Sequence, residues 1–141
     1  MSLKKQMLAP KKAYVIDTTI AKILGFRVSQ DKGRFLENIV FLELKRRIKG
    51  DIYYHQGKYE CDFVLREGGK IFQAIQVTQH LQEESLAKRE QAGLIEAMQT
   101  YHLKEGLILT ENESRTETVT VNDEIFTVTV QPIWEWLLTF P

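Results

Sequence analysis

The chain has 141 residues, with 19 basic and 19 acidic side chains, so its formal net charge is zero. Its length suits one domain, and the balanced charge excludes a global basic field that would attract nucleic acid non-specifically. A single cysteine excludes an internal disulfide, and no apolar run approaches the roughly 20 residues of a membrane span.

The amino-terminal residues are polar and rich in lysine, which predicts that the fold begins after them. We expect residues 1–12 to form a flexible leader or a cloning-derived linker, and residues 13–141 to form a single domain. The polar start suggests that the chain was cut from a longer protein. The first residues lack the apolar core of a signal peptide, and with the single cysteine this predicts a cytoplasmic location.

Two helices are predicted before the first strand. Asp17 or Thr18 is a plausible N-cap for a short helix that ends near Gly25. Residues 34–49 show the clearest helical spacing of apolar side chains, and Gly50 is predicted at the C′ position that ends this helix.

The remaining elements follow an order that is typical of a mixed sheet. Their predicted ranges are strands at 52–55, 59–66 and 71–79, a helix at 83–102, a strand at 106–110, a polar loop at 111–117, strands at 119–121 and 125–130, and a helical turn at 133–138. Gly68-Gly69 and Asn122-Asp123 predict tight turns. A helix between two strands predicts a parallel crossover, and the hairpins make the central sheet mixed, so the sequence predicts an α/β fold.

Several segments also carry more specific patterns. In chain order they are Tyr14-Val15-Ile16-Asp17-Thr18, Gly33 to Leu44 (GRFLENIVFLEL), Glu60-Cys61-Asp62-Phe63-Val64, Ile75-Gln76-Val77, Arg89-Glu90, Lys104 to Thr110 (KEGLILT) and Ile133 to Leu138 (IWEWLL). Together they resemble the nuclease-like C-terminal domain of prokaryotic AAA-type ATPases, often labelled DEXX-box ATPases. Thr19 stands where that family commonly has a glycine.

This resemblance implies a restriction-endonuclease-like fold of the PD-(D/E)xK superfamily, with an αβββαβ core and helices flanking the sheet. In that family the domain follows an ATPase module, so we expect the upstream ATPase module of the same parent protein as a partner, with DNA as a further candidate. The chain itself contains no Gly-x-x-x-x-Gly-Lys-Ser/Thr loop, so we do not expect it to bind ATP through one.

The resemblance also implies a place for metal-dependent chemistry. Hydrolysis of a phosphodiester uses a metal ion, and Mg²⁺ prefers carboxylate oxygens. Glu37 in the first long helix and Glu60 and Asp62 in the second strand are the candidate metal ligands. Strand alternation places Glu60 and Asp62 on one face, and pairing of the strands brings Asp62 near Gln76.

The chemistry is predicted to be degenerate, because neutral residues stand where an active enzyme has an acid and a lysine. We therefore expect Glu37, Asp62, Gln76 and Thr78 to mark a vestigial pocket with at most weak Mg²⁺ binding, and no cofactor in this chain. A displaced cation from Lys88 or Arg89 would preserve activity. The plainer alternative is that the acids are ordinary solvated or paired residues.

Other candidate residues have structural interpretations beside the functional ones. The basic run Lys45, Arg46, Arg47 and Lys49 would contact phosphates, or would complement a helix C-terminus. His80 would lie near the pocket, Cys61 is predicted to be buried and unreactive, and Trp134 and Trp136 would stack on bases or pack on the sheet.

Three functions follow from these observations. The leading hypothesis is a non-catalytic accessory domain that serves nucleic-acid or protein interaction. The alternatives are an active metal-dependent DNA endonuclease with a displaced cation, and a structural or oligomerisation domain.

Overall fold

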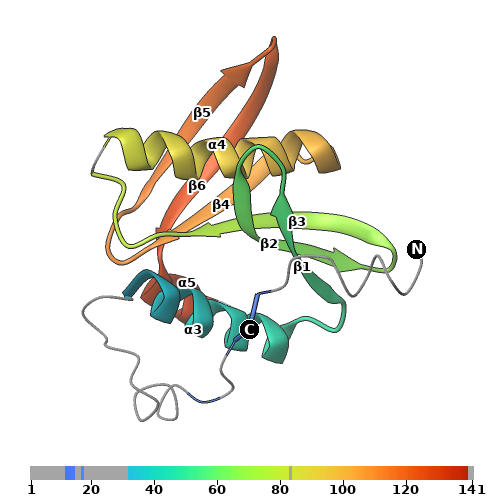
Figure 1. Cartoon of the computed structure of the whole chain (residues 1–141), viewed down its shortest axis with the longest axis vertical. Helices are drawn as coiled ribbons and strands as arrows, with labels where there is room; N and C mark the ends of the chain where they lie inside the picture. Colours follow the sequence, from blue (N-terminus) through green and yellow to red (C-terminus); the bar gives the residue numbers. More distant parts are fainter. Residues whose placement is uncertain (1–11, 15–16, 18–31, 83, 140–141) are drawn as a thin grey trace.

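The computed structural model describes residues 12–14, 17, 32–82 and 84–139, which form a six-stranded sheet with helices on both faces (Figure 1). The elements are α3 (Lys32–Arg47), β1 (Asp51–Gln56), β2 (Glu60–Glu67), β3 (Lys70–Val77), α4 (Glu84–Tyr101), β4 (Glu105–Thr110), β5 (Arg115–Val121), β6 (Glu124–Pro132) and α5 (Ile133–Leu138). The mixed α/β fold is therefore confirmed. The predicted short helix between Asp17 and Gly25 lies outside the described residues.

The strand order in the sheet is β1-β2-β3-β4-β6-β5. The pairs β1–β2, β2–β3 and β5–β6 are antiparallel, whereas β3–β4 and β4–β6 are parallel. Helix α4 connects β3 to β4, as expected for parallel neighbours, which need a long crossover. The predicted crossover is confirmed.

The core has two layers, one on each face of the sheet. Helix α4 packs on one face, where Cys61, Val64, Leu94 and Met98 belong to one buried cluster. Helices α3 and α5 cover the other face (Figure 1), where Phe63 belongs to a second cluster with Val40, Leu44, Ile75 and Trp136. Strands β2 and β3 are thus buried on both faces, which explains their long apolar runs.

Both predicted tight turns are present. Gly68 and Gly69 have φ values of 57° and 78°, and Asn122 and Asp123 have φ values of 50° and 63°. Two consecutive residues with positive φ match the twist of antiparallel strands, and glycine, asparagine and aspartate tolerate this conformation best. These turns fix the pairing of β2 with β3 and of β5 with β6.

Two local predictions are corrected. Strand β5 begins at Arg115, inside the segment predicted as a loop. The prediction missed this start because β5 is an edge strand with exposed charged side chains, and such a strand shows no alternation of apolar residues. Gly50 is not among the residues with positive φ. Glycine is needed at position 50 for another reason, since a Cβ there would lie closer than 3.0 Å to the carbonyl oxygen of Arg66.

A carboxylate on α4 holds the β1–β2 turn. Glu96 hydrogen-bonds His55 Nε2 at 3.0 Å, and it accepts the backbone N–H groups of Lys58 at 2.9 Å and Tyr59 at 3.2 Å. The His55 bond is the largest of the interactions that lower the pKa of Glu96. A lowered pKa means that this stabilisation is present above the unfolded value, about 4.3, and is lost as the pH falls through the folded value.

We expect Glu96→Ala to lower the free energy of unfolding by about 1–2 kcal/mol at neutral pH, because three donors lose their acceptor. Urea denaturation measures this change. Glu84→Ala is the matched control on the same helix, since the Glu84 side chain is 83% exposed and pairs only with Lys88 among the described residues. Equal losses in the two variants would contradict a specific role for Glu96.

Candidate functional site

Glu37 is the acid that α3 contributes to the site. It lies between the apolar positions that face the sheet, so its side chain is only 18% exposed. Its Oε1 accepts hydrogen bonds from the Tyr14 hydroxyl at 2.7 Å and from Lys12 Nζ at 3.0 Å. A carboxylate that is largely removed from water needs such partners.

Asp62 is the acid that β2 contributes, and an irregularity in strand pairing directs it. Tyr53 of β1 pairs with Val64 of β2, and the next pair is His55 with Cys61. Two steps along β1 therefore correspond to three steps along β2. Asp62 lies within this β-bulge. Bulges redirect side chains and are common next to functional sites.

The Asp62 carboxylate is buried and fully engaged. Its Oδ2 accepts the backbone N–H of Val77 at 2.9 Å, and its Oδ1 accepts Lys12 Nζ at 2.7 Å. Only 7% of the residue is exposed. The helix acid and the strand acid therefore meet, as the sequence predicted, and they meet at one ammonium group.

Lys12 is the residue that sequence analysis missed. It was assigned to the leader, and the site was expected to lack a lysine. The structure places its ammonium between Glu37 and Asp62, 5.4 Å from the centre of the Tyr54 ring. These contacts span 25 and 50 residues of sequence, so no motif spacing signals them.

The electrostatics of the site follow from burial and from this triangle of charges. Burial, and then the charge of Glu37, raise the pKa of Asp62 to about 6, although Lys12 and the Val77 N–H oppose the rise. Burial acts to lower the pKa of Lys12, but Asp62 and then Glu37 outweigh it, so the pKa is raised. Burial, and then the bond to Glu37, raise the pKa of Tyr14. The lysine therefore stays charged at neutral pH, while the pKa of Asp62 is about 6.

Gln76 contacts Asp62, but not at the carboxylate. Its Oε1 accepts the backbone N–H of Asp62 at 3.1 Å, and its Nε2 donates to the buried carboxylate of Glu90 on α4. Glu90 is the second residue of the site that was not expected there, although it lies on the inward stripe of α4. Thr78 is buried, and its hydroxyl donates to the carbonyl of His80 at 3.4 Å.

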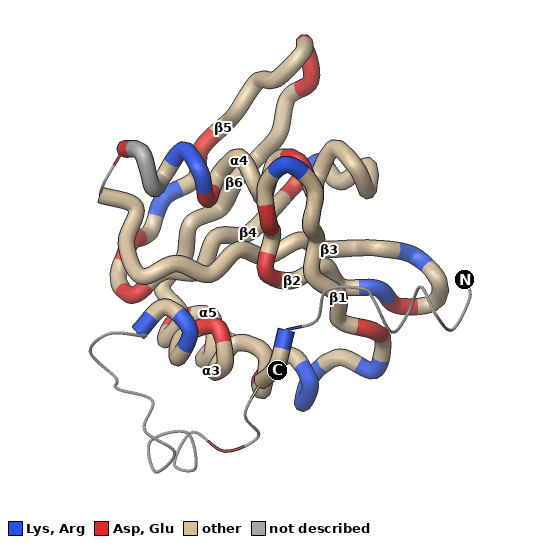
Figure 2. The backbone as a smooth tube through the Cα atoms, viewed as in Figure 1, with Lys and Arg blue, Asp and Glu red and all other residues tan. Residues whose placement is uncertain are grey.

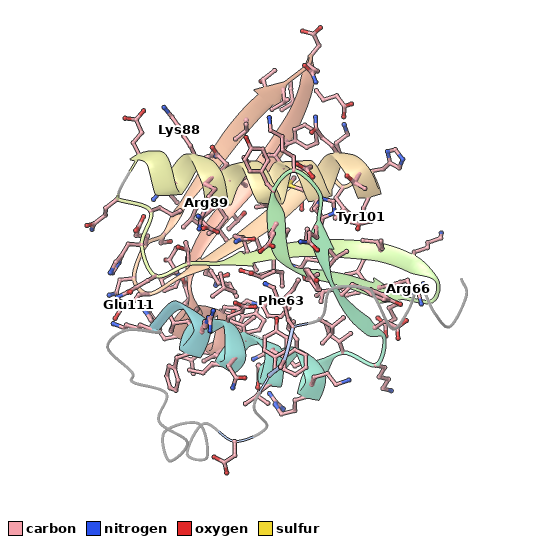
Figure 3. All side chains as sticks on the ribbon, viewed as in Figure 1. Phe63, Arg66, Lys88, Arg89, Tyr101 and Glu111 are labelled. Atoms are coloured by element: carbon pink, nitrogen blue, oxygen red, sulfur yellow. The ribbon has the colours of Figure 1, made fainter. Side chains whose placement is uncertain are left out.

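The other predicted site residues lie elsewhere. Glu60 is exposed at the start of β2. Among the described residues, it takes no part in the ion pairs that Lys12 forms with Glu37 and Asp62. Lys88 projects from α4 and pairs with Glu84, and Arg89 pairs with Glu90 (Figure 3). Neither α4 cation reaches Asp62 or Glu37. His80 faces Glu111, with 3.8 Å between Nε2 and Oε2.

Two members of the predicted phosphate-binding run form ion pairs within the protein. Arg46 and Arg47 both pair with Glu43, and Arg47 also lies 4.8 Å from the Trp136 ring and donates to Leu137 O at 2.9 Å. Lys45 and Lys49 are exposed near the end of α3 (Figure 2). Unlike the two arginines, these lysines do not pair with Glu43.

The site does not fit a resident magnesium ion. The two acids converge on an ammonium, and Gln76 turns its oxygen to a backbone N–H instead. Within the described ranges no three acids, histidines or cysteines are grouped as metal ligands. Two carboxylates whose negative charge is already partly neutralised by a lysine make a poor site for a hard divalent cation.

A pocket of about 410 Å³ adjoins the acids between α3 and the β1–β2 pair. It is lined by Lys12, Tyr14, Phe41, Ile52, Tyr53, Tyr54, Asp62 and Phe63. Figure 3 shows Phe63 between the sheet and α3. The Tyr14 and Phe41 rings stack, with centroids 4.0 Å apart and planes at 11°. The pocket thus combines aromatic walls with one ammonium and one carboxylate.

Comparisons with known proteins find a distant similarity and no matching family. No family description matches it. It is similar to the uncharacterized protein MJ1544 of Methanocaldococcus jannaschii, with 34% identity over 147 aligned residues that cover 99% of this chain. The alignment covers 32% of the archaeal protein, so the chain spans about a third of that relative's length. In the described part of the chain, no helix is long and apolar enough to cross a membrane.

Proposed function

We propose that the chain is the nuclease-like C-terminal accessory domain of a P-loop ATPase of the AAA, DEXX-box type. Its degenerate PD-(D/E)xK site binds a nucleic acid or protein partner of the parent ATPase in the cytoplasm and does not cut. The order of helices and strands, the sequence motifs and the match to one part of a longer archaeal protein support this proposal.

The observation that carries the proposal is the position of the Lys12 ammonium. It lies 3.0 Å from Glu37 Oε1 and 2.7 Å from Asp62 Oδ1. A metal ion would need these same oxygens, so it would have to displace the lysine or bind beside its positive charge. Both routes cost free energy, because like charges repel and a partly buried ammonium would lose its partners.

The same observation favours one second candidate, an active nuclease whose cation has moved. In that case Lys12 is the displaced cation, supplied from the amino-terminal segment instead of from the strand after Gln76. The two functions predict opposite effects of removing the charge, so one variant separates them.

We expect wild-type protein to leave plasmid DNA and single-stranded oligonucleotides intact in Mg²⁺ or Mn²⁺, and Lys12→Met to bind Mn²⁺ at least about tenfold more tightly. A unit charge a few ångströms from the metal contributes several kcal/mol at a protein surface, which exceeds the free energy of a tenfold change. Titration calorimetry measures the affinity and gel electrophoresis the cleavage.

Lys49→Met is the control, because Lys49 is an exposed lysine outside the contacts of both acids. Wild-type cleavage that disappears in Asp62→Ala and in Lys12→Met would overturn the proposal and establish the active nuclease.

A further inference from the structure

The pocket beside Lys12 has the size and walls of a ligand site. Its volume of about 410 Å³ lies in the usual range of small-molecule pockets, about 300–1,000 Å³. Five of its lining residues are aromatic: Tyr14, Phe41, Tyr53, Tyr54 and Phe63. Because Tyr14 is stacked on Phe41, two of these rings form a continuous wall. Aromatic walls favour a flat ring as the occupant.

The charges around the pocket restrict its ligand further. A second cation would be repelled by Lys12, which already occupies the cation position near Tyr54. A phosphate inside the pocket would be repelled by Glu37 and Asp62. A neutral planar ring that carries both hydrogen-bond donors and acceptors avoids both penalties, and a nucleobase is such a ring.

Lys12 also provides a specific contact for that ring. An ammonium has three N–H donors. Among the described residues Glu37 and Asp62 accept two of them, which leaves one for a ring nitrogen or carbonyl of the base. The lysine that blocks a metal ion is therefore also able to donate a hydrogen bond to a base.

An exposed lysine lies one helical turn from a residue that lines the pocket. Lys45 is four residues after Phe41 on α3, so it lies one turn further along the same helical face. Lys45 is exposed, and basic residues cluster at this end of α3, next to β1 (Figure 2). The backbone of a nucleic acid whose base enters the pocket would pass close to this lysine.

We propose that this pocket, lined by Tyr54, Phe63 and Lys12, binds one unpaired base of a single-stranded nucleic acid, with Lys45 on the adjacent phosphate. The inference rests on the proposed function and deepens it, because it selects nucleic acid over a protein partner and single strands over duplexes. In a duplex the base is stacked and paired, so it does not enter a pocket between α3 and the β1–β2 pair without unpairing.

The test is fluorescence anisotropy with a labelled single strand, as DNA and as RNA of the same sequence, and with the matching DNA duplex, all in EDTA. We expect at least one single strand to bind more tightly than the duplex by about tenfold or more. We expect Tyr54→Ala to weaken that binding by roughly five- to hundredfold, the range that stacking on one aromatic ring supports. Tyr54→Phe keeps the ring and should stay within about twofold.

Three further variants keep the test decisive. Lys45→Gln should lower the slope of log affinity against log salt by about one, and it lies on the surface, where folding is not at risk. Phe72→Ala and Trp134→Ala replace aromatic residues that are 46% and 56% exposed and do not line the pocket. Neither should change the affinity.

Several results would overturn the proposal that the pocket binds a base. They are equal affinity for duplex and single strand, no binding of either, or a loss of affinity in Trp134→Ala with none in Tyr54→Ala. The outcome is separate from that of the metal experiment. A protein that cuts DNA and still loses binding in Tyr54→Ala refutes the non-catalytic proposal and keeps the base pocket.

Discussion

We expect Lys12→Met to lower the free energy of unfolding by about 2 kcal/mol at pH 8. Removing one partner of a buried ion pair costs about 3–5 kcal/mol, and the value is smaller here because the Lys12 side chain is 24% exposed. Methionine keeps most of the side-chain volume, so the loss reports on charge. The variant leaves Glu37 and Asp62 facing each other with no cation between them.

The same variant should show a distinctive pH dependence. The folded pKa of Asp62, about 6, is above the unfolded value of about 3.9, so the contribution of this group is largest at low pH and is lost as the pH rises through 6. Without Lys12 the folded pKa rises further. The deficit of the variant relative to wild type should therefore be larger at pH 8 than near pH 5.

Urea denaturation of wild type and Lys12→Met at the two pH values measures this difference. Carboxylates that do not contact Lys12 cancel in the comparison. Lys49→Met, at an exposed position, should match wild type at both values. A deficit of the same size at pH 5 and pH 8 would show that Lys12 acts through Glu37 or through packing and not through Asp62.

We expect Gly93→Ala to lower the free energy of unfolding by about 2–3 kcal/mol, the largest effect predicted here for a single methyl group. Gly93 lies where α4 crosses β2, and an added Cβ would be closer than 3.0 Å to the carbonyl oxygen of Glu60. Both sides of this contact are backbone, so relief requires α4 to move away from the sheet. Leu94 and Met98 would then lose contacts in the core.

Gly33→Ala is the matched control for this prediction. Gly33 is also in a helix, and no heavy atom lies within 4 Å of an added Cβ there. Alanine should stabilise that helix by up to about 1 kcal/mol through its better propensity. Unfolding in urea gives both values. A Gly93→Ala protein as stable as wild type would mean that α4 does not approach β2 as closely as the structure places it.

Local patterns in the sequence were enough to predict most of the architecture. The long apolar segments became β2 and β3, because a strand buried on both faces needs apolar side chains on both. The Gly68-Gly69 and Asn122-Asp123 turns were predictable because positive φ restricts the choice of residue. The start of β5 was missed, since an edge strand is specified by its pairing with β6 and needs no apolar pattern.

By itself, the sequence determined which residues α3, β2 and β3 bring to the sheet: Glu37, Asp62 and a neutral Gln76. Periodicity is local, so it places side chains within one element. Only the tertiary structure decided that Lys12 lies between the acids and that Gln76 faces Glu90. Ion pairs depend on distance in space, and the two contacts of Lys12 join segments 25 and 50 residues apart through a bulge that pairing with β1 creates.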